Sequence, residues 1–473
     1  MPAKIGSISS PGGSFDYLRN SAAFVLLVAV CLILLALLFS QIGLPLFVIE
    51  IVGLLLACII VPARWPYGAV VVLSIASVMP RLSVEIGGWN VRPEHCATFL
   101  VLVVLLIRCT LHENLRAKLT FADLAVLAYT AWNYVSSLWM SPDPRSTLRW
   151  ALLNNLVVLP YFLIRFLVTD ERILRWVFRA YLVVGIAECA FALAAFASRQ
   201  ILGTSFGTEI DQYAGGLGGV YGTQYEPNLL GSFAGCTSII LLVFYFLSPR
   251  KSHWLIGGAI ISVAALIVSL SRAAFLAFAL ALIILAFVGA RAGLVSLRKL
   301  LTLGLILAFF IAPIAVTGGR NLLSRFATLS VEGFESDAEA VARLTALTAA
   351  FEDIAQHPLV GNGTASFQLL ADAKQLPILG DRPWVGNSPI RILHDTGAIG
   401  LLLIGVVAVA IGRSVRQVMV AQGREREIVF ALTSGCLVYA IAFMSTEGTM
   451  LSFFWVHIGL LASACSVART ATT

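Results

Sequence analysis

Apolar stretches long enough to cross a lipid bilayer recur along almost the whole chain, and they constrain its fold more than any other feature. The hydrocarbon core of a bilayer is about 30 Å thick, so a helix needs roughly 17–25 mostly apolar residues to cross it. Of the 473 residues, 59% are hydrophobic and 12% are charged, which is far more apolar than a soluble core requires. We therefore predict an all-α membrane protein of about fourteen transmembrane helices, at residues 22–39, 44–61, 67–79, 96–111, 121–139, 149–168, 173–197, 228–247, 254–270, 273–289, 300–316, 389–412, 428–446 and 451–467.

The basic residues fall mainly in alternate connections between these stretches. If the N-terminus is cytoplasmic, the basic connections all face the cytoplasm, as the positive-inside rule requires. These inner residues are Arg64, Arg108, Arg116, Lys118, Arg165, Arg172, Arg175, Arg250, Lys251, Arg291, Arg298, Lys299, Arg413, Arg416, Arg424 and Arg426. We expect a multi-pass protein with both termini in the cytoplasm. The net charge of +7 then reflects topology and gives no support for nucleic-acid binding.

The apolar pattern also suggests how the chain is divided. The first apolar stretch is long for the core of a signal peptide and lacks a clear small-residue cleavage site. We expect residues 1–21 to be a cytoplasmic segment and residues 22–473 to form a single helical membrane domain. The two longest connections, residues 198–227 and 317–387, are rich in acidic residues and are expected to face outward. A connection as long as the second is uncommon unless it is functional.

The longer outward connection, residues 317–387, has a local pattern of its own. Apolar residues at helical spacing predict an amphipathic helix from Ala338 to Gln356, and His357-Pro358 ends it. At the end of the connection, Asn387-Ser388-Pro389 combines an N-cap residue with a proline at the first helical position. This combination predicts the start of the next membrane helix.

Four short motifs follow one another between residues 220 and 405. In chain order they are Glu226-Pro227-Asn228, Ser271-Arg272, Arg343 with the later turn from His357 to Gly363, and the run from Asn387 to Gly400. Together they resemble the O-antigen ligase and polymerase family, in which a His-Asn pair leads into a helix with an acidic residue and a spaced glycine pair. The positions that fit are Asn387, Asp395, Gly397 and Gly400, whereas Gly386 stands where many members have the histidine. We expect Asn228 and Asn387 to position the helices that start beside them.

The resemblance implies a metal-independent membrane glycosyltransferase without a cofactor. The implied donor is a glycan on a polyprenyl diphosphate carrier, and the implied acceptor is a glycan or lipid hydroxyl at the periplasmic face of the bacterial inner membrane. A flippase and a chain-length regulator are the implied protein partners. About fourteen helices and the missing histidine favour a polymerase in surface or exopolysaccharide assembly. The alternatives are an O-antigen ligase that transfers glycan to lipid A core and, from another class, a transporter of polysaccharide or lipid carrier.

Three arginines are predicted to bind the diphosphate, namely Arg272, Arg343 and Arg391. A guanidinium binds phosphate oxygens bidentately and keeps its charge at working pH. It can therefore stabilise the leaving diphosphate as the sugar bond breaks. Arg272 has the alternative of a side chain that reaches the bilayer interface. For Arg343 the alternative is an ion pair with Glu339, and for Arg391 it is an ion pair with Asp395.

The acceptor hydroxyl has to lose its proton, and a nearby side chain of suitable pKa assists this step. Gly386 cannot supply one. We predict that Asp395, His394 or Glu226 acts as the catalytic base, with a slight preference for Asp395 because it also fits the acidic position of the family. The alternatives are a packing role for His394 and a reaction that needs no base.

Overall fold

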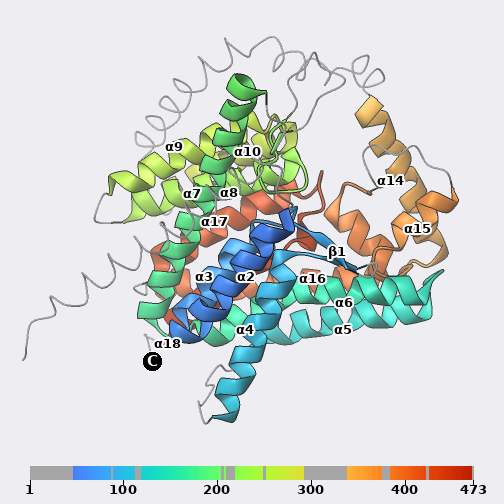
Figure 1. The fold of residues 1–473 in the computed structure, drawn as a ribbon, viewed down its shortest axis with the longest axis horizontal. Helices are drawn as coiled ribbons and strands as arrows, with labels where there is room; N and C mark the ends of the chain where they lie inside the picture. The colour runs from blue at the N-terminus through green and yellow to red at the C-terminus, as the bar shows by residue number, and fades with distance from the viewer. Residues whose placement is uncertain are drawn as a thin grey trace, which may run out of the picture.

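The computed structural model describes residues 46–86, 89–111, 119–203, 207–208, 219–248, 252–291, 338–374, 384–421 and 425–470. The predicted all-α class is confirmed, because these residues form fourteen α-helices and a short β-hairpin (Figure 1). The predicted spans at residues 22–39 and 300–316 lie outside the described residues, as do parts of both long outward connections. Each of the other twelve predicted spans contains a helix.

The elements keep the order of the apolar stretches. Before the longer connection the helices are α2 (Leu46–Ala63), α3 (Tyr67–Ser77), α4 (Pro93–Thr110), α5 (Phe121–Trp139), α6 (Pro144–Leu167), α7 (Glu171–Leu202), α8 (Pro227–Leu247), α9 (His253–Val268) and α10 (Arg272–Arg291). The elements that follow are α14 (Ala338–Gln356), α15 (Ser366–Ala373), α16 (Ser388–Ala421), α17 (Arg426–Ala442), the 3₁₀ turn η1 (Gly448–Met450) and α18 (Ser452–Thr470). Between α3 and α4, strand β1 (Val84–Ile86) pairs antiparallel with β2 (Trp89–Val91).

Six of the described helices are long and apolar enough to cross a membrane by length and composition, namely α4, α6, α7, α8, α16 and α18. Shorter apolar segments lie in α2, α3, α9 and α10. These helices support the assignment as a membrane protein, while the total of about fourteen spans stays a prediction.

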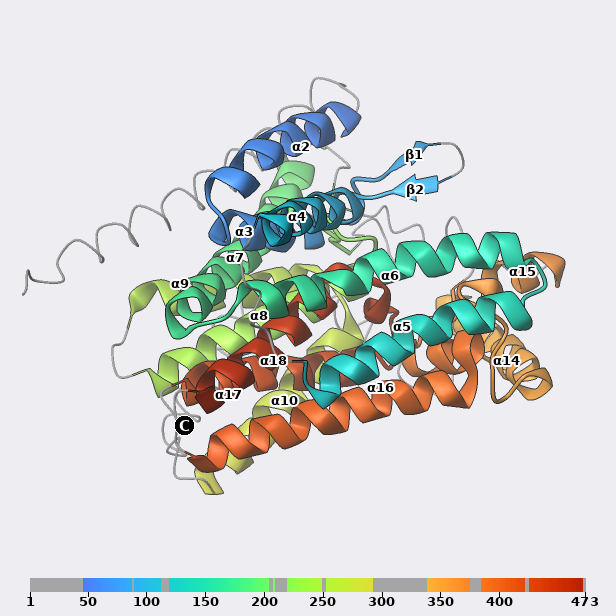
Figure 2. The ribbon, with the colours of Figure 1, turned by 90° about the horizontal axis from the view of Figure 1, so that it is seen from below.

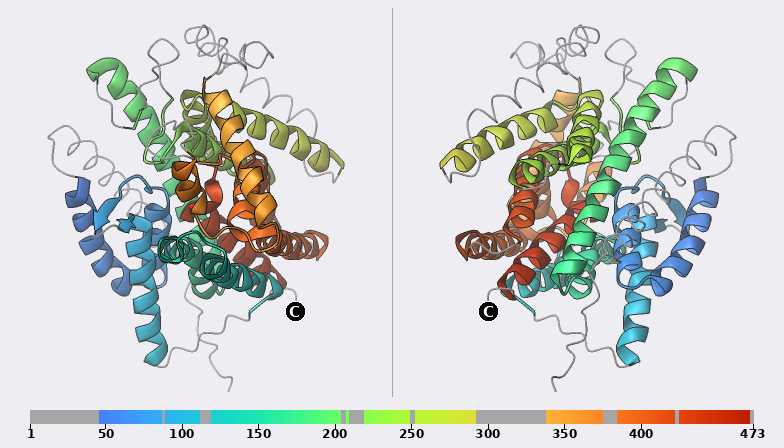
Figure 3. Two further views of the ribbon diagram at one scale, coloured as in Figure 1. Left: turned by 90° about the vertical axis from the view of Figure 1, so that its right-hand side faces the viewer. Right: turned by 90° about the vertical axis from the view of Figure 1, so that its left-hand side faces the viewer.

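The helices share one large apolar core, in which α8 packs against α9, α10 and α17. Figure 3 shows α2–α4, in blue, on one flank of the bundle, and the orange and red helices of the C-terminal part in the middle and toward the opposite flank. A second, small core lies under helices α14 and α15, where Ala349, Ala350 and Phe367 pack together. This small core fixes α14 and α15 to the start of α16.

Contacts between connections agree with the alternation expected from the basic residues. On the predicted inner side, Arg175 of α7 pairs with Glu425 at 2.9 Å. On the predicted outer side, the Arg81 N–H donates to the Thr223 carbonyl at 3.2 Å. Figure 2 shows the β-hairpin, α14 and α15 toward one end of the bundle and the C-terminus toward the opposite end. Each of these two contacts joins connections that the prediction assigns to the same side of the membrane, and the orientation of the chain stays a prediction.

The structure confirms the predicted helix from Ala338 to Gln356, and it corrects two other expectations. Helix α16 continues beyond the predicted 389–412 to Ala421 and bends at Gly397, where φ is 65° and ψ is −171°. The predicted span at residues 428–446 ends too late, because α17 ends at Ala442.

Helix α17 ends early because the two carbonyl groups that follow Ala442 bond to another part of the chain. The carbonyl of Phe443 accepts from the Ser388 N–H at 2.9 Å, and that of Met444 accepts from Asn387 Nδ2 at 2.6 Å. Both carbonyl groups therefore serve the start of α16. A hydropathy pattern cannot register this, since Phe443 and Met444 continue the apolar run.

Candidate functional site

Two groups of polar and charged residues lie around the start of α16, and they differ in exposure. The first, the buried cluster, consists of Asp353, Arg391, His394 and Asp395. The second, the outer rim, consists of Glu226, Arg272, Arg343 and Thr446. Every side chain of the buried cluster is removed from solvent, whereas the three charged residues of the outer rim are half-buried. The predicted catalytic and diphosphate-binding residues are divided between these groups.

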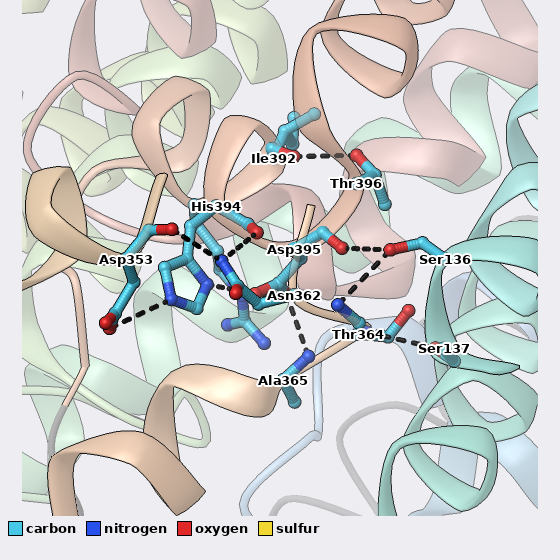
Figure 4. Close-up of polar contacts among 12 residues, drawn as sticks. Ser136, Ser137, Asp353, Asn362, Thr364, Ala365, Ile392, His394, Asp395 and Thr396 are labelled. Atoms are coloured by element: carbon cyan, nitrogen blue, oxygen red, sulfur yellow. Dashed lines mark hydrogen bonds and ion pairs between the residues drawn. The ribbon is translucent and has the colours of Figure 1, made fainter. Parts of the chain in front are cut away.

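The Asp395 carboxylate has three partners within the protein (Figure 4). Its Oδ2 accepts from the Ala365 N–H at 2.9 Å and from Arg391 Nε at 3.3 Å. Its Oδ1 lies 2.9 Å from His394 Nδ1. Ala365 has φ 58°, which is uncommon for a residue with a side chain, and the bond to Asp395 holds its N–H in place. Asp395 thus joins α16 to the turn before α15, and the predicted alternative of an Arg391–Asp395 ion pair is present.

The turn that follows α14, residues 357–363, holds the bend in α16. A Cβ on Gly397 would lie 2.2 Å from the Leu359 carbonyl oxygen. A Cβ on Gly361, where φ is 82°, would lie 2.5 Å from the carbonyl carbon of Asp395. Only glycine fits these two positions without a shift of the backbone. Two of the motif glycines therefore serve a close contact between backbones.

Helix α5 supports the same bend from the other side (Figure 4). Ser136 Oγ donates to the Asp395 carbonyl at 2.6 Å and accepts from the Gly363 N–H at 3.2 Å. Ser137 Oγ accepts from the Thr364 N–H at 3.0 Å. This role could not be predicted from the sequence, because two serines within an apolar run are also typical of helix packing.

His394 completes the buried cluster and is 0% exposed. Its Nδ1 lies 2.9 Å from Asp395, its Nε2 lies 3.5 Å from Asp353 Oδ2, and its ring contacts Phe367 edge to face. Burial by itself favours the neutral acid of Asp353. The contact with the His394 ring and a hydrogen bond from Lys374, whose Nζ lies 2.8 Å from Asp353 Oδ1, nevertheless hold the pKa of Asp353 below its ordinary value. His394 is therefore packed between two carboxylates.

Arg391 links the buried cluster to Glu447, a residue that the sequence analysis did not identify. Arg391 Nη1 pairs with the Glu447 carboxylate, and the guanidinium lies 4.9 Å from the centre of the Trp384 ring. Glu447 Oε1 also accepts from the Gly386 N–H at 2.9 Å. A carboxylate thus touches the position where the family resemblance places a histidine. This proximity is visible only in three dimensions, because sixty-one residues separate Glu447 from Gly386.

The outer rim converges on the segment after α17, residues 443–447. Glu226, directly before α8, accepts a hydrogen bond from Thr446 Oγ1 through its Oε1. Arg343 of α14 donates from Nη1 to the Ser445 carbonyl at 3.2 Å. The start of α16 joins them, since Ser388 Oγ donates to the Thr446 carbonyl at 2.9 Å. One short segment therefore brings three of the four motifs together.

The remaining motif, Ser271-Arg272, is bonded to the start of α8. Ser271 Oγ donates to Asn228 Oδ1 at 2.7 Å, so that Arg272 begins α10 beside the helix that Glu226 precedes. Leu270 has φ 56°, a left-handed value that marks a sharp turn between α9 and α10. Asn228 thus connects two motifs.

Asn387 lies at the start of α16, as the sequence predicts. Its Oδ1 accepts from the Ile390 N–H at 3.0 Å, which satisfies one of the unpaired donors at the helix start. Its Nδ2 donates to the Met444 carbonyl at 2.6 Å. Asn387 thus couples α16 to the segment that the outer rim shares.

Chemically, the outer rim combines two guanidinium groups with one carboxylate. Guanidinium groups suit a leaving group that gains negative charge, and a carboxylate can accept a proton. Within the described ranges, no group of three or more His, Cys, Asp and Glu side chains is arranged to hold a metal ion.

Comparison with known proteins finds a similarity in the central region of the chain. Residues 257–405 match the family model described as O-antigen ligase. This match confirms the resemblance drawn from the motifs, and it includes Arg272, Arg343 and the whole buried cluster. Glu226, Thr446 and Glu447 lie outside the matched residues. No match was found among curated proteins.

Proposed function

We propose that this protein is a glycan polymerase. It transfers an oligosaccharide from a polyprenyl diphosphate carrier to an acceptor glycan hydroxyl at the periplasmic face of the bacterial inner membrane. The family match supports glycan transfer from lipid-linked substrates in a membrane setting. The observation that carries the proposal is the convergence of Glu226 and Arg343 on residues 445 and 446, with Arg272 starting the neighbouring helix.

In this proposal, Arg272 and Arg343 bind the diphosphate of the donor. The leaving carrier gains negative charge as the bond to the sugar breaks, so two fixed cations stabilise the transition state more than the ground state. Both arginines are half-buried, which keeps them within reach of a lipid headgroup while reducing screening by water. Neither a metal nor a cofactor is required for this step.

Arg391 is better suited to positioning than to binding the diphosphate. It is 4% exposed and pairs with two carboxylates, those of Asp395 and Glu447. A guanidinium that already neutralises two anions has little attraction left for a third. We assign it to holding Glu447 beside Gly386.

We assign the role of catalytic base to Glu226. Among the three predicted bases, Glu226 is the half-buried one, whereas Asp395 and His394 are 1% and 0% exposed. A base has to lie within hydrogen-bond reach of the acceptor hydroxyl. The atoms of Asp395 and His394 are occupied by contacts that shape the bend in α16, so substrate would reach them only if that bend opened.

The test is to delete the gene and to analyse the glycan that remains on the carrier. A polymerase predicts the accumulation of single repeat units. Full-length polymer on the carrier, with none on lipid A core, would instead identify a ligase. Loss of glycan from the outer face altogether would point to a transporter. Genes for a flippase and a chain-length regulator beside this one would agree with the polymerase.

A further inference from the structure

Arg81 is an outward arginine that the proposed mechanism leaves without a role. It is exposed and follows α3 directly in the connection to the β-hairpin. Its guanidinium carbon lies 3.8 Å from the centre of the Tyr221 ring, and its Nη1 donates to the Tyr225 carbonyl at 2.9 Å. Its N–H donates to the Thr223 carbonyl at 3.2 Å. These contacts fix the guanidinium on one segment, residues 219–226, which we call the strap.

The strap is itself anchored inside the protein. Glu188 of α7, which is 3% exposed, accepts from the Thr223 N–H at 2.9 Å and from Thr223 Oγ1 at 2.7 Å. Gln224 Nε2 donates to the Val78 carbonyl at 2.9 Å. A buried carboxylate is costly in a membrane protein unless it has such partners. The strap is therefore a firm support for the residues it carries, including Glu226 at its end.

A neighbouring arginine shows what distinguishes Arg81. The guanidinium carbon of Arg92 lies 5.9 Å from the Tyr225 ring, so this side chain also borders the strap. However, Arg92 is paired with Glu94 at 2.8 Å, and its side chain is 11% exposed. Among the described residues, no carboxylate forms an ion pair with Arg81. Arg81 thus presents a positive charge to solvent that the described protein does not neutralise.

A fixed, exposed guanidinium is suited to binding an anion. One N–H of Arg81 is used by the Tyr225 carbonyl, and the remaining donors are available for the oxygens of a carboxylate or phosphate. Because Tyr221 and the strap already hold the side chain, little rotational freedom is lost on binding. The position also suggests which substrate is bound: Tyr225 directly precedes Glu226, and the acceptor hydroxyl has to reach Glu226.

We propose that Arg81, supported by Tyr221, forms an anion-binding subsite for the acceptor. It binds a carboxylate or phosphate group of a negatively charged acceptor, carried either on the glycan itself or on the diphosphate of the acceptor's lipid carrier. The proposal rests on the proposed function, because Glu226 defines the acceptor side. The two arginines of the outer rim remain assigned to the donor.

The test uses the full-length protein in proteoliposomes, with carrier-linked repeat units purified from a deletion strain as donor. The acceptor hydroxyl of the donor is chemically blocked, so that donor and acceptor can be varied separately. The acceptor is either the unblocked carrier-linked unit or the oligosaccharide released from the carrier, the latter in its native form and with its carboxyl groups reduced. At saturating donor, Arg81→Ala should raise the acceptor KM by about tenfold or more, the scale of losing hydrogen bonds to a charged group, while kcat and the donor KM change little. Arg81→Lys should show a smaller increase.

Two substitutions of Tyr221 test the support of Arg81 by the ring. Tyr221→Leu removes the ring face and should raise the acceptor KM, and Tyr221→Phe, which keeps the ring, should raise it less than Tyr221→Leu does. An Arg81→Ala effect that appears with the released oligosaccharide and disappears after carboxyl reduction places the anion on the glycan. An effect confined to the carrier-linked acceptor places it on the diphosphate.

An unchanged acceptor KM in Arg81→Ala with every acceptor, or a change in the donor KM alone, would overturn the subsite. Failure of the proposed function gives a different result. In that case the wild-type protein itself, with correct insertion shown by protease protection, transfers no glycan to any of the acceptors.

Discussion

Two regions of this molecule use the same residue types, arginines and carboxylates, in opposite ways. In the buried cluster, Arg391 and Asp395 are 4% and 1% exposed, and they bond to each other and to the backbone of a neighbouring turn. In the outer rim, Arg272, Arg343 and Glu226 are half-buried and come from three different helices or their starts. The difference indicates that charge in the first region holds the chain in shape, and in the proposed function charge in the second region meets the substrate.

The largest expected effect tests the buried cluster through stability. Asp395→Ala removes one of the two carboxylates paired with Arg391 and leaves the Ala365 N–H without its acceptor, deep inside the protein. Breaking a buried ion pair in this way costs about 3–5 kcal/mol. We expect a strong loss of folded protein and a lower melting temperature in detergent. A variant that stays as stable as wild type but transfers no glycan would reverse the distinction between the two regions.

The next effect tests the outer rim through rate. Arg272→Ala or Arg343→Ala should lower transfer by about 10²–10³-fold at normal protein levels, the scale of removing one electrostatic donor, and lysine should restore only part of the rate. Arg145→Ala is the matched control, because Arg145 is exposed in another predicted outward connection and lies outside both groups. Near-normal transfer by either alanine variant of the rim would remove that arginine from the site.

Glu447 lies between the two regions, and its substitution should have an intermediate effect. Glu447→Gln keeps the size of the side chain but removes the charge that holds Arg391 and receives the Gly386 N–H. We expect a loss of roughly tenfold in transfer, about 1.4 kcal/mol, because the start of α16 is less well positioned. Glu447→Asp should recover part of it. A loss as large as that of the rim arginines would instead place Glu447 in contact with substrate.

The smallest effect concerns pH. The pKa of Asp353 is below the ordinary value of 3.8, so its ionised form stabilises the folded state. This contribution is fully present above the ordinary pKa and is lost as the pH falls through the lowered one. The difference in melting temperature between wild type and Asp353→Asn should therefore be constant near neutral pH and shrink in strong acid. A difference that grows on acidification would contradict the assigned direction.

The sequence could predict those parts of the fold that depend on local pattern. Helix α14 has the predicted bounds, because its apolar spacing and the following His-Pro are both local signals. Helix α5 likewise matches residues 121–139, where Thr120 and Asp123 form a capping box. The bend at Gly397 and the early end of α17 depend on contacts with distant segments, and local pattern does not contain these.

The same limit applies to the site. The four motifs could be read from the sequence, but the segment that joins three of them, residues 443–447, could not. Its only signals were a polar run and an acidic residue in a short outward connection. The sequence also could not rank Asp395 against Glu226 as a base, because burial and hydrogen-bond partners separate them. The slight preference for Asp395 rested on the family pattern, whereas the proposal of Glu226 rests on its half-buried position.

The most direct test of the distinction between the regions is a paired measurement on Glu226→Gln and His394→Gln in proteoliposomes. For each variant, the transfer rate per folded molecule is measured across pH, together with the melting temperature. We predict that Glu226→Gln melts like wild type but loses about 10²-fold or more in rate and the acidic limb of the pH profile. His394→Gln should melt at a lower temperature while keeping the rate and the pH profile of its folded fraction. The reverse pattern, with a normal rate in Glu226→Gln and a stable but inactive His394→Gln, would contradict the account.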